Sequence, residues 1–298
     1  MRHFLEIDDL ASSELQRVLD LASSTDPARV LAGKGMALIF EKPSARTRNS
    51  MEMAVVQLGG HPVYIQGEEV GLDTRESVED VTNAMAGFHS AIGARVFDHG
   101  VVERMAAVDR VPVVNLLSDQ GHPMQALADL LTMRREFGAL EGRSVAYVGD
   151  ANNVARSLAI GAALSGVQFR IASPSGYTFS EVDLDRIRTH GEPLIFDRPE
   201  EAVAGADAVY ADTWTSMGQE AEAEKRRRDF EGFQIDERMM GLASAGAIFL
   251  HCLPAHRGEE VVDEVLDGSR SRIWVQAANR MHAARGLLAF LMAEADEQ

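Results

Sequence analysis

Hydroxyl and guanidinium side chains cluster at Ser44-Ala45-Arg46-Thr47-Arg48, between an apolar run and a helix-spaced segment. The run Met36–Phe40 predicts a buried strand and Arg46–Leu58 predicts a helix. Where a strand ends and a helix begins, free backbone N–H groups and the helix dipole bind anions, and arginine adds forked donors suited to phosphate. The alternative is an ordinary serine cap with two solvated arginines. The spacing is not that of a nucleotide-binding Gly-Lys loop.

A second polar group, His122 and Gln125, opens the helix-spaced segment Pro123–Phe137 after another apolar run. His122 can donate to a carbonyl or phosphoryl oxygen, and Gln125 can both accept from and donate to an amide. Taken alone, the two residues are better explained as caps of a long amphipathic helix.

Two later turns place polar side chains at the ends of predicted strands. Asp150-Ala151-Asn152-Asn153 follows the strand Ser144–Val148. Gly149 alone does not make the Gly-x-Gly-x-x-Gly fingerprint, so a nicotinamide cofactor is disfavoured. Asp212 opens the string Asp-Thr-Trp-Thr-Ser-Met-Gly, and its carboxylate could pair with a ligand ammonium. Both segments could also be plain turns, with Trp214 packed inside.

The only cysteine, Cys252, follows His251 at the end of an apolar run. A thiol nucleophile and a metal pair are both conceivable. Adjacent residues of an extended chain point to opposite faces, and no further ligands occur at zinc-like spacing, so we expect no metal. The remaining alternative is a buried, inert cysteine. A single cysteine also excludes an intrachain disulfide.

Apolar runs and helix-spaced segments alternate along the chain, which predicts an α/β protein of parallel sheets flanked by helices. A length of 298 residues suits two domains, with the switch between them expected near Gly138 and Gly142. Two such domains predict a ligand-binding cleft between them. The remaining predicted elements are strands at 62–65, 91–97, 111–117, 169–172, 207–210 and 247–250, and helices at 78–88, 101–108, 153–164 and 287–294.

The net charge of −17, from 29 basic and 46 acidic residues, disfavours nucleic acid and anionic membranes as partners. Nearly all positive charge is arginine, because the only lysines are Lys34, Lys42 and Lys225. This composition would suit a high-salt cytoplasm or reflect biased composition alone. No signal-like N-terminus and no apolar run of about 18 residues occurs, so we expect a cytoplasmic protein. A local cluster of cations could still bind an anionic substrate.

Taken in order, these motifs resemble the aspartate/ornithine carbamoyltransferase family, and within it the ornithine branch. The segments 44–48, 57–61 and 122–129 correspond to the family strings Ser-Thr-Arg-Thr-Arg, Gln-Leu-Gly-Gly-His and His-Pro-x-Gln-x-x-x-Asp. The ornithine branch adds Asp-x-x-x-Ser-Met-Gly at 212–218, His-Cys-Leu-Pro at 251–254 and the pair Asn279-Arg280. The correspondence covers nearly the whole chain, and strings that are weak singly are strong in register.

The resemblance implies a carbamoyl phosphate-binding domain at 1–132, with the helix 279–298 packing back on it, and an ornithine-binding domain at 133–278. It implies transfer of the carbamoyl group to the side-chain amine of L-ornithine, giving L-citrulline and phosphate, as in arginine biosynthesis. A homotrimer or a multiple of trimers is implied as well. Neither a metal nor an organic cofactor is implied.

The resemblance also assigns roles to residues. Arg95 and His122 would donate to the carbonyl oxygen as it gains negative charge, and Cys252 would position the amine without forming a covalent intermediate. Together with Asp212, these three would be the catalytic residues. Carbamoyl phosphate would be bound by Ser44, Ala45, Arg46, Thr47, Arg95, His122 and Gln125, and ornithine by Asn153, Asp212, Ser216, Met217, Cys252, Leu253 and Arg280.

The chain departs from the family pattern at three places. Ala45 replaces a threonine, Met124 replaces a frequent cysteine, and the segment 71–77 differs from the loop that reaches a neighbouring subunit in the family. Alternative functions are a sister carbamoyltransferase that uses putrescine or N-acetylornithine, and a catalytically silent paralogue. Aspartate is less expected as acceptor, because that branch lacks the Ser-Met-Gly and His-Cys-Leu-Pro strings.

Overall fold

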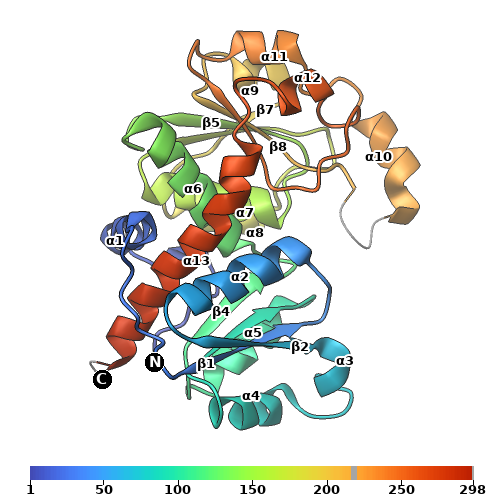
Figure 1. Ribbon diagram of the computed structural model, residues 1–298. Coiled ribbons are helices and arrows are strands. Elements are labelled where there is room, and N and C mark those ends of the chain that lie inside the picture. The colour runs from blue at the N-terminus through green and yellow to red at the C-terminus, as the bar shows by residue number, and fades with distance from the viewer. Residues whose placement is uncertain (216–219, 297–298) are drawn as a thin grey trace. The chain divides into compact units, whose positions relative to one another are not determined.

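A computed structural model describes residues 1–215 and 220–296, which form two compact units (Figure 1). Unit 1 comprises Met1–Leu131 and the chain from Ala278 onward, and unit 2 comprises Thr132–Ala277. The chain passes between the units inside two helices, α6 (Pro123–Phe137) and α13 (Ile273–Asp296). Within the described residues, no helix is long and apolar enough to cross a membrane.

Unit 1 is built on a four-stranded parallel sheet with the strand order β2-β1-β3-β4. After β1 the chain adds β2 on one side and then β3 on the other, so the connections leaving β1 and β3 diverge. Ligands of open α/β sheets bind outside the carboxyl ends of the strands at such a switch point. The strands are β1 (Gly35–Phe40), β2 (His61–Gln66), β3 (Ala91–Arg95) and β4 (Val113–Leu117).

Helices cover both faces of this sheet. Ala37 and Ile39 of β1 pack with apolar residues of α4 (Val78–Ala86) and α5 (His99–Ala107). Figure 1 shows α2 (Ala45–Gln57) on the opposite face. Alternate residues of a strand point to opposite faces, so a strand that is apolar throughout is buried from both sides. The smaller elements of unit 1 are η1 (Ile7–Asp9), α1 (Ser12–Ser23) and α3 (Gly67–Val70).

Close packing attaches α13 to α1 within unit 1. A Cβ atom at Gly286 would lie 2.5 Å from the carbonyl oxygen of Val18, so only glycine fits at this contact. Arg285 donates to the carbonyl oxygens of Ala22 and Ser24, at the C-terminal end of α1. The C-terminal helix is therefore a built-in part of unit 1, which fixes the position of Arg280.

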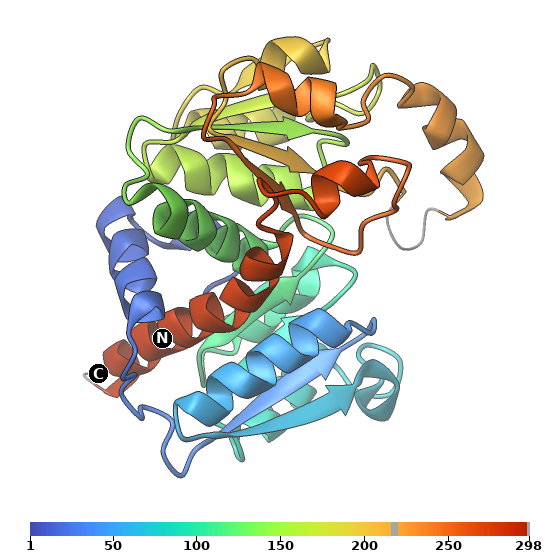
Figure 2. The same ribbon diagram turned by 45° about the horizontal axis from the view of Figure 1, so that its top comes forward.

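Unit 2 has a five-stranded parallel sheet with the order β7-β6-β5-β8-β9, and its switch point lies between β5 and β8. One face packs on α9, α11 and α12, and Figure 2 shows α7 and α8 on the other. The strands are β5 (Ser144–Val148), β6 (Gln168–Ala172), β7 (Leu194–Phe196), β8 (Ala208–Ala211) and β9 (Ile248–His251). The helices are α7 (Asn153–Leu164), α8 (Glu181–Arg188), α9 (Pro199–Val203), η2 (Glu220–Glu222), α10 (Ala223–Asp229), α11 (Glu237–Leu242) and α12 (Asp263–Leu266).

The predicted class of two parallel sheets flanked by helices is confirmed, and one predicted detail is wrong. Residues 287–294 lie in a closing helix as predicted, and that helix extends from Ile273 to Asp296. The helix Pro123–Phe137 has the predicted bounds but is not amphipathic, because every residue from Pro123 to Met133 is buried. Its polar side chains Gln125, Asp129 and Thr132 are buried as well, so its polar face does not turn toward solvent. The predicted cleft between the domains stays a prediction.

Candidate functional site

Three functional side chains of unit 1 converge on the hydroxyl group of a fourth, Thr47. Thr47 Oγ1 accepts hydrogen bonds from Ser44 Oγ at 3.1 Å, from Arg280 Nη2 at 2.7 Å and from Arg95 Nη1 at 3.5 Å. Ser44 caps α2 by accepting from Thr47 N at 3.3 Å. These residues lie at the carboxyl ends of β1 and β3, which is the switch point of the sheet. We call Ser44, Thr47, Arg95, His122, Gln125 and Arg280 the anion cradle.

The electrostatics of the anion cradle favour a bound anion. Arg95 is only 5% exposed, and among the described residues no carboxylate pairs with it. Burial, and then the positive charges of Arg280 and Arg46, lower the pKa of Arg95 to about 10. Because like charges are held together in a site that excludes water, an anion with several oxygens would relieve both the repulsion and the lost hydration.

His122, which follows β4, is a neutral hydrogen-bonding group in this setting. Burial, and then the charges of Arg280, Arg95 and Lys42, lower the pKa of His122 well below its usual value. A neutral imidazole still carries one N–H, which can donate to an oxygen that gains negative charge. The site therefore supplies charge through its arginines and a directed neutral donor through His122.

Gln125 links the arginines to the start of α6. Its Oε1 accepts from Arg280 Nη1 at 2.8 Å, and its Nε2 donates to Asp129 Oδ1 at 2.8 Å. Gln125 is therefore an internal part of the anion cradle, and neither of these contacts is the helix cap that the isolated motif predicts. The structure also groups Arg280 with Thr47 and Gln125, although the sequence comparison assigned Arg280 to ornithine.

The two exposed arginines of α2 differ in their surroundings. Arg48 donates to Glu52 at 2.8 Å and stacks over the ring of Tyr64 at 3.8 Å, so its guanidinium is directed at these two side chains. Arg46 is exposed and forms no ion pair in the described part of the chain. Its positive charge contributes to the lowered pKa of Arg95. Ala45 is the first residue of α2, where the backbone N–H groups have no partner within the helix.

Unit 2 gathers its functional side chains around one buried carboxylate. Asp212 follows β8, is 3% exposed and accepts hydrogen bonds from four donors. Tyr147 OH at 3.2 Å and Asn152 Nδ2 at 2.8 Å donate to Oδ2. Cys252 Sγ and the backbone N–H of Thr213, each at 2.8 Å, donate to Oδ1. Four protein donors hold the carboxylate in one orientation. Asp212 therefore presents a carboxylate in a fixed position at the switch point between β5 and β8.

Two partners of Asp212 escaped the sequence analysis. Asn152 is the cap of α7 and bonds to Asp212, and the ornithine-binding role of Asn153 stays a prediction. The place of Asn152 directly before a helix was the signal, since asparagine is a preferred cap. Tyr147 was hidden because it lies inside a strand that reads as plain core. Burial, and then the charge of Asp212, hold the pKa of Tyr147 well above its usual value, so its hydroxyl keeps the proton that it donates.

Arg226 joins the turn after β5 to the segment that follows Asp212. It donates to Asp150 Oδ2 at 2.7 Å and to the carbonyl oxygen of Trp214 at 2.9 Å. Burial raises the pKa of Asp150, and the ion pair with Arg226 opposes this shift. Trp214 is packed inside, stacked on Phe230 at 5.5 Å. The predicted residues Ser216 and Met217 lie outside the described residues.

Ligand atoms of Asp212, His251 and Cys252 lie within 4.8 Å of one another, so the argument from chain geometry against a shared site is wrong. The chain turns at Leu253, which has a left-handed φ of 62°, and does not continue extended past the strand. His251 Nδ1 accepts from Leu253 N at 2.9 Å, and Nε2 lies 3.1 Å from Glu260. Because both ring nitrogens are engaged, His251 has no lone pair to offer a cation.

Models of known protein families match both units. The carbamoyl-P binding domain of aspartate/ornithine carbamoyltransferase matches residues 2–135, and the Asp/Orn binding domain of the same family matches residues 141–291. The chain belongs to the aspartate/ornithine carbamoyltransferase family. Its anion cradle thus lies mainly in the carbamoyl-P binding domain, joined by Arg280 of α13, and Asp212 lies in the Asp/Orn binding domain.

Relatives of this family are similar over almost their full length. The ornithine carbamoyltransferase of Thermus thermophilus is 48% identical over 98% of this chain and 97% of its own length, and that of Haloquadratum walsbyi is 43% identical over 98% of each. Among solved structures, the Thermus thermophilus enzyme has a TM-score of 0.90 at 45% identity, covering 98% of this chain and 99% of its own. The Pyrococcus furiosus enzyme has a TM-score of 0.93 at 41% identity, with coverages of 98% and 97%.

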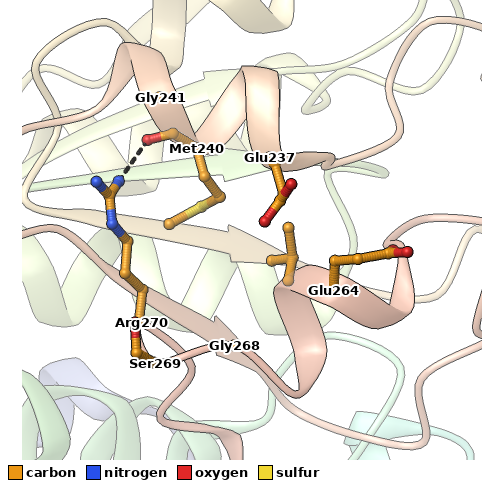
Figure 3. Close-up of a pocket in the computed structure, with 8 residues that line it drawn as sticks. Glu237, Met240, Gly241, Glu264, Gly268, Ser269 and Arg270 are labelled. Carbon is orange, nitrogen blue, oxygen red and sulfur yellow. Dashed lines mark hydrogen bonds between the residues drawn. The ribbon is translucent and has the colours of Figure 1, made fainter.

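Unit 2 also has a surface pocket away from the predicted site residues (Figure 3). It encloses about 530 Å³, open solvent included, between α11, α12 and the turn that follows α12. Glu237 and Glu264 line it, and Arg270 donates to the carbonyl oxygen of Met240 at 2.7 Å. The guanidinium is thus used to join the turn to α11, and none of the lining residues carries a predicted role.

Replacing Tyr147 with phenylalanine tests the role of its hydroxyl. A hydrogen bond to a charged group contributes about 1.5–3 kcal/mol, so losing it should raise the KM for the ligand of Asp212 roughly 10- to 100-fold. Tyr210 provides a matched control, because it is equally buried and stacks on Tyr147 at 5.2 Å, while its hydroxyl accepts from Gln276. Steady-state kinetics with ornithine should show the increase for Tyr147→Phe only; equal effects would assign both hydroxyls to the core.

Proposed function

We propose that this protein is an ornithine carbamoyltransferase, which transfers the carbamoyl group of carbamoyl phosphate to the side-chain amine of L-ornithine. The products are L-citrulline and phosphate. The anion cradle carries this proposal, because Arg95 is buried without a carboxylate partner among the described residues, so an anionic ligand would balance its charge. The relatives titled ornithine carbamoyltransferase support the choice of ornithine as acceptor.

Carbamoyl phosphate binds first in this account. Its phosphate oxygens replace Thr47 Oγ1 as acceptors for the guanidinium groups of Arg95 and Arg280, and Arg46 with the start of α2 completes the phosphate site. The N–H of His122 donates to the carbonyl oxygen, and Gln125 holds the carbamoyl amide. Preorganised donors of this kind stabilise the oxyanion of a tetrahedral intermediate without reorganisation at the moment of reaction.

Ornithine then binds with its α-ammonium at Asp212 and its side-chain amine near Cys252 and Leu253. In water this amine has a pKa close to that of lysine, about 10.4, so the site must favour the neutral form at about 1.4 kcal/mol per unit of pKa. The amine nitrogen attacks the carbonyl carbon, and the bond from that carbon to the phosphate oxygen breaks. The departing phosphate keeps the electron pair and receives the proton that the amine loses.

A citrulline assay with several acceptors tests the proposed function. With carbamoyl phosphate present, ornithine should give citrulline, because the chain presents a fixed anion for a free α-ammonium. N-acetylornithine lacks that charge and should be at least about 100-fold poorer, and aspartate should give no product. Putrescine lacks the carboxylate and should be intermediate. Carbamoylation of N-acetylornithine in preference to ornithine would contradict the assignment of Asp212, and no product from any amine would support a silent paralogue.

We also propose that the chain assembles as a homotrimer or a multiple of trimers, as the family resemblance implies. Exposed apolar side chains support an assembly surface on unit 1. Met53 and Val56 of α2 are 46% and 50% exposed, although both lie on a helix that packs its other side on the sheet. Large exposed apolar groups of this kind are typical of surfaces that bind another protein.

A further inference from the structure

A fully buried histidine–glutamate pair lies directly behind the loop that carries Cys252. Both His251 and Glu260 have side chains with no exposed surface, and His251 Nε2 lies 3.1 Å from Glu260 Oε1. Neither residue touches a ligand in the proposed reaction. A buried carboxylate that serves only packing is unfavourable, since an apolar residue could fill the same space.

The hydrogen bonds determine which nitrogen of His251 carries the proton. Nδ1 accepts from the backbone N–H of Leu253 at 2.9 Å, so Nδ1 is unprotonated. Nε2 therefore carries the hydrogen and donates it to Glu260. Glu260 thus selects the tautomer that can hold Leu253, in the way that an outer carboxylate orients an imidazole in other sites.

The bond to Leu253 N maintains an unusual turn. Leu253 has a φ of 62°, a left-handed conformation that is unfavourable for a residue with a Cβ atom. The same turn aims Cys252 Sγ at Asp212 Oδ1, 2.8 Å away. Energetically unfavourable backbone persists where its surroundings enforce it, and such positions cluster at functional sites.

Glu260 also connects this turn to the loop that carries Asp212. Its Oε1 accepts from the backbone N–H of His256, and His256 Nδ1 lies 3.1 Å from Thr213 Oγ1. Thr213 in turn donates its backbone N–H to Asp212. The loops after β8 and β9 are therefore held together through one buried carboxylate.

We propose that Glu260 and His251 form a positioning pair, which fixes Cys252 and the carbonyl of Leu253 relative to Asp212 so that the attacking amine is oriented. The inference rests on the proposed function and deepens it, because it assigns amine placement to two residues that contact no substrate. The donor site in unit 1 shares none of these contacts. Loss of the pair should therefore affect the acceptor and leave carbamoyl phosphate binding intact.

Two substitutions of His251 separate this role from simple packing. In His251→Asn the side-chain amide can occupy the place of Nδ1 and accept from Leu253 N, whereas in His251→Gln the amide reaches toward Glu260 and leaves Leu253 N without its acceptor. We expect His251→Gln to raise the KM for ornithine at least about tenfold, and His251→Asn to recover at least half of that loss on a logarithmic scale. Glu260→Gln keeps the acceptor oxygen and should change this KM less than about threefold.

Calorimetry with carbamoyl phosphate alone provides the second readout, and its Kd should stay within about twofold of wild type in all three variants. Equal values of the KM for ornithine in His251→Asn and His251→Gln, or a parallel loss of carbamoyl phosphate affinity, would overturn the positioning role. If the His251 variants do not fold, ¹⁵N spectra of the wild-type imidazole decide: hydrogen on Nε2 supports the pair, and hydrogen on Nδ1 contradicts it. A wild type that makes no citrulline would instead refute the proposed function.

Discussion

Replacing Arg95 with alanine should weaken carbamoyl phosphate binding roughly 100- to 1000-fold, yet leave the unliganded protein at least as stable as the wild type. The loss follows from removing charge-assisted hydrogen bonds to an anion inside a buried site. The retained stability follows from the lowered pKa of Arg95, which burial and the charges of Arg280 and Arg46 cause. The charged form of Arg95 is disfavoured in the folded protein, so removing it relieves a penalty on the order of 3 kcal/mol.

The sign of this stability effect can be checked against pH. A base whose pKa falls to about 10 on folding destabilises the protein fully below pH 10, and the penalty is relieved as the pH rises from about 10 toward the pKa of the unfolded chain. At neutral pH the whole penalty is present, so thermal unfolding at pH 7 should give an equal or higher Tm for Arg95→Ala. A large fall in Tm would instead assign Arg95 to structural support.

Arg48→Ala is a matched control for this experiment, since Arg48 lies on α2 beside the anion cradle but pairs with Glu52 and Tyr64. Its affinity for carbamoyl phosphate should stay within about twofold of wild type. Addition of carbamoyl phosphate should raise the Tm of the wild type and of Arg48→Ala, because a ligand stabilises the state that binds it. The same addition should have almost no effect on Arg95→Ala.

Replacing Asp212 with asparagine should lower kcat/KM for ornithine by roughly 100- to 1000-fold, with carbamoyl phosphate binding unchanged. The substitution keeps the shape of the side chain but removes the negative charge that pairs with an ammonium, and a lost buried charge pair costs about 3–5 kcal/mol. Alanine would be a less specific change, because it would leave the donors on Tyr147, Asn152 and Cys252 buried without their acceptor.

A carboxylate elsewhere in unit 2 controls for charge alone. Asp229 pairs with Lys225 at 2.9 Å and accepts from Tyr177, and Asp229→Asn should leave kcat/KM for ornithine within about twofold. Steady-state kinetics and calorimetry measure the two properties separately. Equal losses of ornithine use and carbamoyl phosphate binding in Asp212→Asn would show that Asp212 supports the fold and would reassign its role.

The spacing of apolar residues and the composition were sufficient to predict the two parallel sheets. Strands that are buried on both faces have uninterrupted apolar runs, such as Met36–Phe40 and Ser144–Val148. Spacing and composition failed for β7 (Leu194–Phe196), an edge strand of only three residues, which is too short to show a periodic pattern and whose side chains are largely exposed. They also failed for the first turns of α13, where polar residues such as Gln276 and Asn279 are buried and no separate polar and apolar faces can be recognised.

Some residues of the candidate site could be predicted from the sequence and others could not. Ser44, Thr47 and His122 could be predicted, because each lies between a strand and a helix where ligands gather. The grouping of Arg280 with Thr47 could not, because the sequence does not show which side chains of the returning C-terminal helix meet Thr47, more than 200 residues earlier. Tyr147 was equally hidden, since its hydroxyl emerges from a strand whose residues are all buried. The roles of these residues in catalysis stay predictions.

Titration of carbamoyl phosphate into the wild-type protein, in the absence of ornithine, tests the central claim most directly. The claim is that buried arginines at the carboxyl ends of β1 and β3 bind the phosphorylated carbamoyl donor. Calorimetry should record saturable heat with one site per chain, an affinity that falls as salt rises, and loss of that heat in Arg95→Ala but not in Arg48→Ala. Folded protein that gives no heat at millimolar carbamoyl phosphate, or heat that persists in Arg95→Ala, would contradict the account.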